Sequence, residues 1–162
     1  MKENTMGLFN KKLFNFVKDA GEKLLDTITG KEAEAAEKVK DRVQKQNLDL
    51  QDLDVKIEGD KVILNGKAQS AEALEKAILA AGNINGVGSV ETNVEVEGSD
   101  IQDPTFYEVQ SGDTLSGIAK KFYGDANQYP KIFEANKPML SDPDKIYPGQ
   151  NLRIPHDAKK AA

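Results

Sequence analysis

The sequence predicts an α+β fold made of two small domains, and three observations carry this prediction. The apolar period of the 162-residue chain changes several times between that of a helix and that of a strand. A polar segment at 98–105, GSDIQDPT, contains Gly and Pro and lacks an apolar period, which is typical of a linker. An N-terminal helix and an α-β-β-α-β order precede this segment, and a β-α-α-β order follows it. Domains of ~50 to 60 residues can fold alone, so both parts are long enough.

The N-terminal segment, residues 1–30, is predicted to be helical. Its apolar residues recur at steps of three and four, and Gly30 stands where a terminating residue belongs. The polar face mixes acidic and basic residues, whereas helices that lie on membranes are usually more basic. We therefore expect this stripe to pack on the protein, with membrane binding as the less favoured alternative. The stripe consists of Leu13, Val17, Ala20, Leu24 and Ile28.

Residues 31–97 are predicted to form the first domain. A helix over 32–46 is followed by two alternating segments around a Gly-Asp turn, a pattern that indicates a hairpin over 52–66. Ser70 is a good N-cap for the next helix, which Gly82 ends. A third strand, residues 90–96, then closes the unit with one buried and one solvated face. The helix before it should make a right-handed crossover, so this strand is expected to be parallel to its predecessor.

Residues 106–156 are predicted to form the second domain, with a short tail at 157–162. Asp113 is expected to cap its first helix, and Tyr129 is expected to be buried by its second helix. The last strand can pair with the first. In order, the expected elements are a strand over 106–109, a helix that Gly124 ends, a helix over 127–136 and a strand over 151–154.

Composition argues against several classes of function. With 27 acidic against 22 basic residues the net charge is -5, and no basic cluster is visible that could neutralise phosphates, so we expect no nucleic-acid partner. The chain has no cysteine, which removes disulfides, thiolate zinc sites and thiol nucleophiles. The single histidine, His156, lies outside any motif, and neither Ser111 nor Ser116 has an identifiable base. The sequence therefore favours a protein that is not an enzyme.

The pattern of apolar residues favours a cytoplasmic protein, which we expect to be a monomer. Asn and Lys residues interrupt the N-terminus every few positions, whereas a secretory signal needs a continuous apolar stretch. The longest apolar run in the body of the chain, residues 77–81, is far shorter than the ~20 residues that span a bilayer.

Several longer motifs resemble known families. The segments YEVQSGDTLSGIAKKFYGDANQYPKIFEANK and IYPGQNLRIP resemble the LysM module. The segments DVKIEGDKVILNGKAQSAEALEKAI and VGSVETNVEV resemble the BON domain, whose motifs are less specific. Together with GLFN and FVKDAGEKL near the N-terminus, nearly the whole chain resembles the cytosolic bacterial BON–LysM potassium-binding proteins. The residues MKENT before Met6 and the extra residues around 10–13 depart from that pattern.

The resemblance implies that the protein binds K⁺ through backbone carbonyl oxygens. Such neutral oxygens can replace the hydration shell of a large monovalent cation. A helix leaves its last carbonyls without intrahelical partners, so the helix end at 80–82 is a source of acceptors. Glycines at Gly82 and Gly86 are expected to allow positive φ and a close approach of the backbone. The ligands that the resemblance implies are Val17, Lys18 and Ala20 in the N-terminal segment and Gly82, Ile84 and Val87 in the first domain.

Spacing alone would assign these residues to the core and to a helix cap, so the ion site depends on the resemblance. In the same interpretation, the ion orders the arrangement of the BON and LysM domains and the protein acts as an ion sensor. The alternative is that the LysM half binds glycans containing N-acetylglucosamine, which a cytoplasmic protein would rarely meet. The residues implied for that role are Gly112, Asp113, Thr114 and Leu115, which face Pro138, Met139, Leu140 and Ile146.

Overall fold

The computed structural model has an α+β fold, as predicted, with two compact units at Met1–Gln102 and Asp103–Ala162. No helix of the described residues is long and apolar enough to cross a bilayer. The structure describes residues 9–18, 32–84, 86–96, 105–137 and 139–155.

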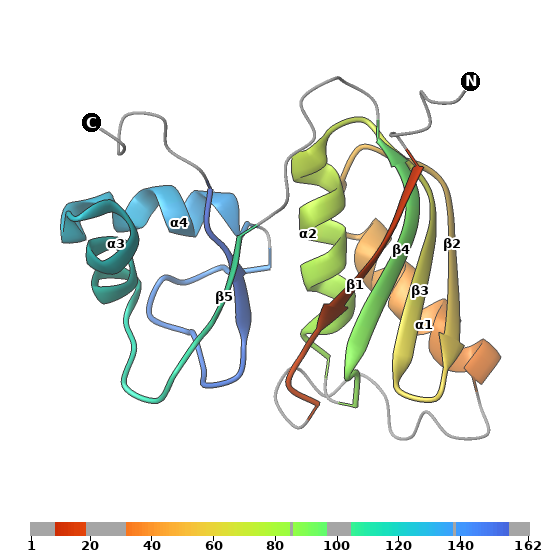
Figure 1. Ribbon diagram of the computed structural model, residues 1–162, viewed down its shortest axis with the longest axis horizontal. Helices are drawn as coiled ribbons and strands as arrows, with labels where there is room; N and C mark the ends of the chain where they lie inside the picture. Colours follow the sequence, from red (N-terminus) through yellow and green to blue (C-terminus); the bar gives the residue numbers. More distant parts are fainter. Residues whose placement is uncertain (1–8, 19–31, 85, 97–104, 138, 156–162) are drawn as a thin grey trace. The chain divides into compact units, whose positions relative to one another are not determined.

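The first unit contains a four-stranded sheet in the order β1-β4-β3-β2 (Figure 1). The predicted hairpin is confirmed, because β2 and β3 are antiparallel and joined at Gly59, where φ is +64°. The predicted parallel pair is also confirmed, because Val62 of β3 lies opposite Val90 of β4. The strands are β1 (Phe9–Asn15), β2 (Leu50–Glu58), β3 (Lys61–Ala68) and β4 (Ser89–Val96).

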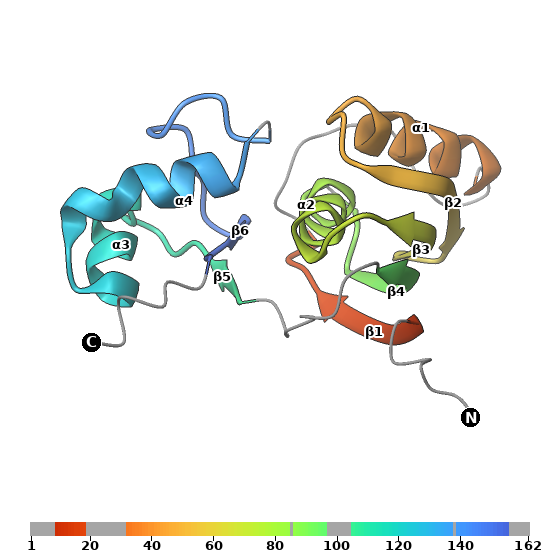
Figure 2. The same ribbon diagram turned by 90° about the horizontal axis from the view of Figure 1, so that it is seen from above.

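Two helices, α1 (Glu32–Gln44) and α2 (Ala71–Gly82), lie on one face of this sheet (Figures 1 and 2). The Ser70 hydroxyl accepts a hydrogen bond from the Ala73 backbone N–H at 3.1 Å, which confirms the predicted N-cap of α2. Burial of aliphatic side chains between helices and sheet removes apolar area from water and stabilises the unit. This core includes Val39, Val43, Val62, Leu64, Ile78, Leu79 and Val90.

The prediction of a helix beginning near Leu13 is wrong, because residues 9–15 form strand β1. Only Leu13 of the predicted helical stripe lies in this strand, which pairs antiparallel with β4, so a tertiary partner overrides the local spacing there. Phe14 lies opposite the buried Val90, whereas Leu13 lies opposite Glu91 and is 57% exposed. The rest of the predicted helix, residues 19–31, lies outside the described residues.

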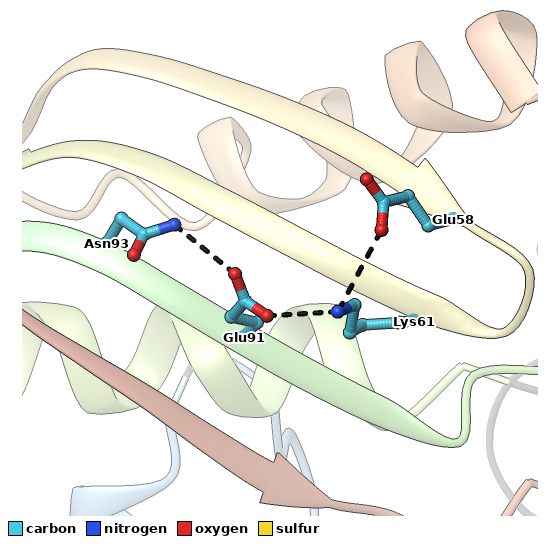
Figure 3. Close-up of polar contacts among 4 residues, drawn as sticks. All are labelled: Glu58, Lys61, Glu91 and Asn93. Carbon is cyan, nitrogen blue, oxygen red and sulfur yellow. Dashed lines mark hydrogen bonds and ion pairs between the residues drawn. The ribbon is translucent and has the colours of Figure 1, made fainter.

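Because β1 pairs with β4, β4 is a central strand of the sheet. Glu91 on this strand is buried, whereas the sequence pattern predicted a solvated side chain. On this polar face the Lys61 Nζ lies 3.0 Å from a Glu91 carboxylate oxygen and 3.9 Å from Glu58 (Figure 3). The Asn93 amide donates to the other Glu91 oxygen at 3.5 Å. The hydrogen bond and the charge of Glu91 raise the pKa of Lys61. Lys61 therefore compensates the buried carboxylate of Glu91.

The second unit pairs a two-stranded antiparallel sheet with two helices. Its first and last strands pair through Tyr107 and Leu152, as predicted. Its core comprises Val109, Leu115, Ile118, Ala119, Ile132, Leu140, Leu152 and Ile154. The elements are β5 (Phe106–Glu108), α3 (Leu115–Tyr123), the 3₁₀ turn η2 (Ala126–Gln128), α4 (Tyr129–Ala135) and β6 (Asn151–Arg153).

Two predictions for this unit are wrong. The N-cap of α3 is Thr114, whose hydroxyl accepts from the Gly117 N–H at 3.1 Å, because Asp113 lies one residue too early and bonds elsewhere. Tyr129 is 39% exposed, since α4 begins at this residue after the 3₁₀ turn and buries Ile132 instead.

Candidate functional site

The end of β1 runs beside the loop that follows α2. The Phe16 N–H donates to the Gly88 carbonyl at 2.9 Å, and the Gly86 N–H donates to the Lys18 carbonyl at 2.7 Å. These main-chain bonds join two segments that are far apart in sequence. We call residues 16–18 and 82–88, without residue 85, the carbonyl junction.

Gly82 allows the two segments to approach closely. A Cβ at this position would overlap with the ring of Phe16, which is itself 8% exposed. The expectation that Gly82 has a positive φ is wrong, since it is the last residue of α2, whereas Gly86 has a φ of +102°. Glycine is therefore needed at 82 for space and at 86 for backbone conformation.

The carbonyl junction contains five of the six residues that the resemblance implies as potassium ligands. The backbone of Val17 and Lys18 lies against the end of α2 and the loop after it, which carry Gly82, Ile84 and Val87, while Ala20 lies outside the described residues. The Ile84 carbonyl accepts the Val87 N–H at 3.0 Å. Because a carbonyl oxygen has two lone pairs, such a bond leaves a second acceptor position.

Two charged residues beside the carbonyl junction, Arg42 and Asp60, are not indicated by the sequence pattern. Arg42 of α1 donates from its Nε to the Ala80 carbonyl in the last turn of α2, at 2.7 Å. The Asp60 carbonyl accepts from the Gly88 N–H at 2.8 Å, and its carboxylate lies 3.5 Å from the Lys18 Nζ. A basic residue in the last turn of α1 was visible in the sequence, but its partner on another helix was not.

The chemistry of the carbonyl junction fits a large monovalent cation. The backbone offers neutral oxygens at the negative end of the α2 dipole. Among the residues that the structure describes, no group of three or more His, Cys, Asp or Glu side chains could hold a metal ion. A carboxylate cage of the kind that divalent ions prefer is therefore absent from the described part of the chain.

The second unit has a different polar site at the loop before α3. The Tyr107 hydroxyl donates to a carboxylate oxygen of Asp113 at 2.6 Å, and the Gln110 N–H donates to the same oxygen at 2.9 Å. These two hydrogen bonds lower the pKa of Asp113, and the bond to Asp113 raises the pKa of Tyr107. The Lys121 Nζ lies 5.0 Å from the centre of the Tyr107 ring. The arrangement fixes the loop at 110–114.

The structure places the residues implied for glycan binding in different environments. Leu115 and Leu140 are 2% and 3% exposed and belong to the core, so their side chains cannot cover a sugar as expected. Met139 and Ile146 are partly buried against the same core. Gly112 and Thr114 are exposed, Asp113 is held by Tyr107, and Pro138 lies outside the described residues.

Comparison with protein families agrees with this two-unit architecture. The BON domain model matches residues 31–98, and the LysM domain model matches residues 107–155. The fold and its loops thus define a two-module protein of the BON and LysM type, and both modules belong to binding families.

Similarity to known proteins identifies the family to which the chain belongs. The potassium binding protein Kbp of Escherichia coli O6:H1 is 50% identical over 148 residues, which are 90% of this chain and 99% of that protein. The chain belongs to the BON–LysM family of Kbp. An uncharacterized protein of Deinococcus radiodurans is 38% identical over 114 residues, 64% of this chain and 44% of that protein. An esterase of Mycobacterium tuberculosis is 50% identical over 52 residues, but these are 11% of the esterase, too little to transfer an activity.

Proposed function

We propose that this protein is a cytoplasmic potassium-binding protein that holds K⁺ at the carbonyl junction. The observation that carries the proposal is the hydrogen bond from Gly86 to the Lys18 carbonyl, because it joins the two segments from which the ligands would come. The 50% identity to a protein named for potassium binding supports it. The proposed ligands are the backbone carbonyl oxygens of Val17, Lys18, Ala20, Gly82, Ile84 and Val87.

Neutral carbonyls favour K⁺ over Na⁺ at such a site. Na⁺ holds its water more strongly, so a wide cage of weak dipoles compensates its dehydration poorly. The α2 dipole adds partial negative charge without a carboxylate, whose stronger field would favour smaller or divalent ions. Selectivity then follows from the number and weakness of the oxygens rather than from any side chain.

Binding of the ion would also act as a switch. A cation that is ligated by both segments of the junction stabilises only the state in which both are in place. We expect this ordering to extend to the arrangement of the BON and LysM units, so that the ion-bound form is more compact. The protein would then report the K⁺ concentration as a change of shape.

The direct test is a titration with KCl and NaCl at matched ionic strength, followed by ¹³C carbonyl chemical shifts. We expect K⁺ to shift the carbonyl resonances of Val17, Gly82 and Ile84, while Na⁺ shifts them little and the carbonyl of Gly112 serves as an internal control. Solution scattering with and without K⁺ tests the switch. Equal responses to both salts would indicate ionic screening and would contradict the proposal.

The LysM match supports a second candidate, the binding of N-acetylglucosamine-containing glycans by the second unit. Because Leu115 and Leu140 are core residues, backbone groups near Gly112 and the half-buried Met139 would have to contact the sugar. Chitin oligomers titrated into the protein provide the test. Tight oligomer binding together with no K⁺ response would make this the main function.

A further inference from the structure

We propose that Arg42 makes the cation site selective for singly charged ions, an inference that rests on the potassium site proposed above. Arg42 is in the last turn of α1, and its Nε donates to the Ala80 carbonyl at 2.7 Å. Ala80 is in the last turn of α2, two residues before Gly82, whose carbonyl is assigned to the ion. The bond therefore fixes a positive charge at the helix end that the site uses.

The geometry of a helix limits the distance between this charge and the ion. Backbone atoms lie about 2 Å from the helix axis and rise about 1.5 Å per residue, so the carbonyl oxygens of Ala80 and Gly82 are about 5 Å apart. The guanidinium consequently lies within about 10 Å of an ion at Gly82. At that range unit charges in a protein still interact by more than thermal energy unless water screens them fully.

Arg42 carries the positive charge of a guanidinium group. Among the residues that the structure describes, Lys18 and Asp60 also have contacts at this end, and their charged groups lie 3.5 Å apart and offset each other. Both are about half exposed, at 60% and 49%, so water screens them further. Arg42 is anchored between two helices and is the better placed group to act on the site.

A fixed positive charge discriminates between ions by their charge. Its repulsion of an ion is proportional to the charge of that ion, so a dication is penalised twice as strongly as K⁺. If removal of Arg42 raises the affinity for K⁺ by a given factor, the affinity for a dication of equal size rises by the square of that factor. Ba²⁺ is the suitable probe, since its ionic radius is close to that of K⁺.

The test compares calorimetric titrations of the full chain with KCl and BaCl₂ at constant ionic strength. In Arg42→Gln the amide nitrogen is as many bonds from Cα as Nε, so the bond to Ala80 can persist without the charge. We expect about threefold to tenfold tighter K⁺ binding and about tenfold to hundredfold tighter Ba²⁺ binding. Arg42→Lys keeps the charge and should leave the ratio of the two affinities within about twofold of wild type.

The matched control is Lys67→Gln, because Lys67 is exposed and lies about 20 Å along β3 from the strand end that adjoins Asp60. It changes the net charge equally and should leave both affinities unchanged. A wild-type protein that does not bind K⁺ would overturn the proposed function. A wild-type protein that binds K⁺, combined with an unchanged ratio in Arg42→Gln, would overturn this inference alone.

Arg42→Met is a second neutral variant, which is used in case Arg42→Gln does not fold correctly. Circular dichroism checks the fold of each variant. An increased ratio of Ba²⁺ affinity to K⁺ affinity in either neutral variant that folds supports the inference. If both neutral variants fail to fold, Arg42 is a structural residue and the inference is overturned.

Discussion

The two units of this protein fix their functional loops with different parts of the polypeptide. In the BON unit, main-chain hydrogen bonds join the end of β1 to the loop after α2, and the critical position, Gly82, has no side chain at all. In the LysM unit, side-chain hydrogen bonds hold the corresponding segments in place. The Asp113 carboxylate fixes the loop before α3, and the Asn136 amide connects α4 to β6.

This difference determines how each unit can be tested. A loop held by side chains can be released by removing one functional group. A loop held by the backbone must be disturbed by adding atoms, because the carbonyls themselves cannot be deleted by substitution. The three predictions that follow use this contrast, beginning with the largest expected effect.

The first prediction concerns Asn136, which is 1% exposed. Its amide nitrogen donates to the Ile132 and Arg153 carbonyls at 2.7 and 2.9 Å, and its oxygen accepts the Arg153 N–H at 2.7 Å. Asn136→Ala would leave these buried groups unpaired and should lower the free energy of unfolding of the LysM unit by about 4 kcal/mol. Urea denaturation of the full chain, followed by LysM resonances, measures the loss.

Exposed Asn127 supplies the matched control, since Asn127→Ala should cost little. K⁺ binding should persist in Asn136→Ala under conditions in which its LysM unit stays folded, because all proposed ligands are outside that unit. Loss of K⁺ binding in this variant would show that the backbone-built site depends on the LysM fold, and the contrast between the units would fail.

The second prediction concerns Gly82. In Gly82→Val the new side chain overlaps with the Phe16 ring, so β1 must move away from α2. We expect a loss of about 2 kcal/mol in stability and at least about a tenfold loss in K⁺ affinity. Chemical denaturation and calorimetric titration measure the two effects separately.

Ala71→Val serves as its control, because Ala71 begins the same helix at the opposite end from Phe16. It introduces the same β-branched residue and should leave K⁺ affinity unchanged. If Gly82→Val binds K⁺ like the wild type, the close approach of Phe16 to Gly82 is irrelevant to the ion site.

The third and smallest prediction concerns Tyr107. Tyr107→Phe removes the hydrogen bond to Asp113 but leaves the one from Gln110, so the LysM unit should lose about 1 kcal/mol at neutral pH. The pKa of Asp113 lies below its ordinary value of 3.8 in the folded protein. Its stabilising contribution is therefore present above that pH and is lost as the pH falls through the lowered pKa.

Tyr107→Phe should accordingly reduce the loss of LysM stability between about pH 5 and pH 2. Thermal unfolding across this pH range measures the change. Tyr123→Phe is the control, because the Tyr123 hydroxyl donates to the uncharged Pro155 carbonyl at 2.6 Å. It should lower stability without altering the acid dependence, and equal pH profiles for the two variants would contradict the role given to Asp113.

The sequence alone predicted features that are determined by residues close together in the chain. The hairpin at Gly59 and the N-cap at Ser70 follow from local turn and cap chemistry, and both are confirmed. The sequence predicts a helix from Leu13 onward because helical apolar spacing is a local signal, whereas the pairing of β1 with β4 joins segments that are distant in the chain. Apolar periodicity cannot reveal such a distant partner.

The proposed ion site could not be derived from residue patterns alone. Backbone carbonyls are present at every position, so the side chains of Ile84 and Val87 carry no signal beyond their burial. The resemblance supplied the candidate positions. The contacts of Gly82 with Phe16 and of Arg42 with Ala80 depend on the folded arrangement, and the sequence could not supply them.

The pairing of β1 with β4 also affects how the chain is made. Phe9 lies opposite Glu95 and Asn15 lies opposite Ser89, so β1 cannot pair until β4 has been synthesised. At roughly 5 to 20 residues per second, the ribosome adds the intervening ~80 residues in about 4 to 16 seconds. During that time the segment 9–15 is synthesised but has no strand to join. The carbonyl junction, which needs the end of β1 in place, is therefore among the last features of the BON unit to form on the ribosome.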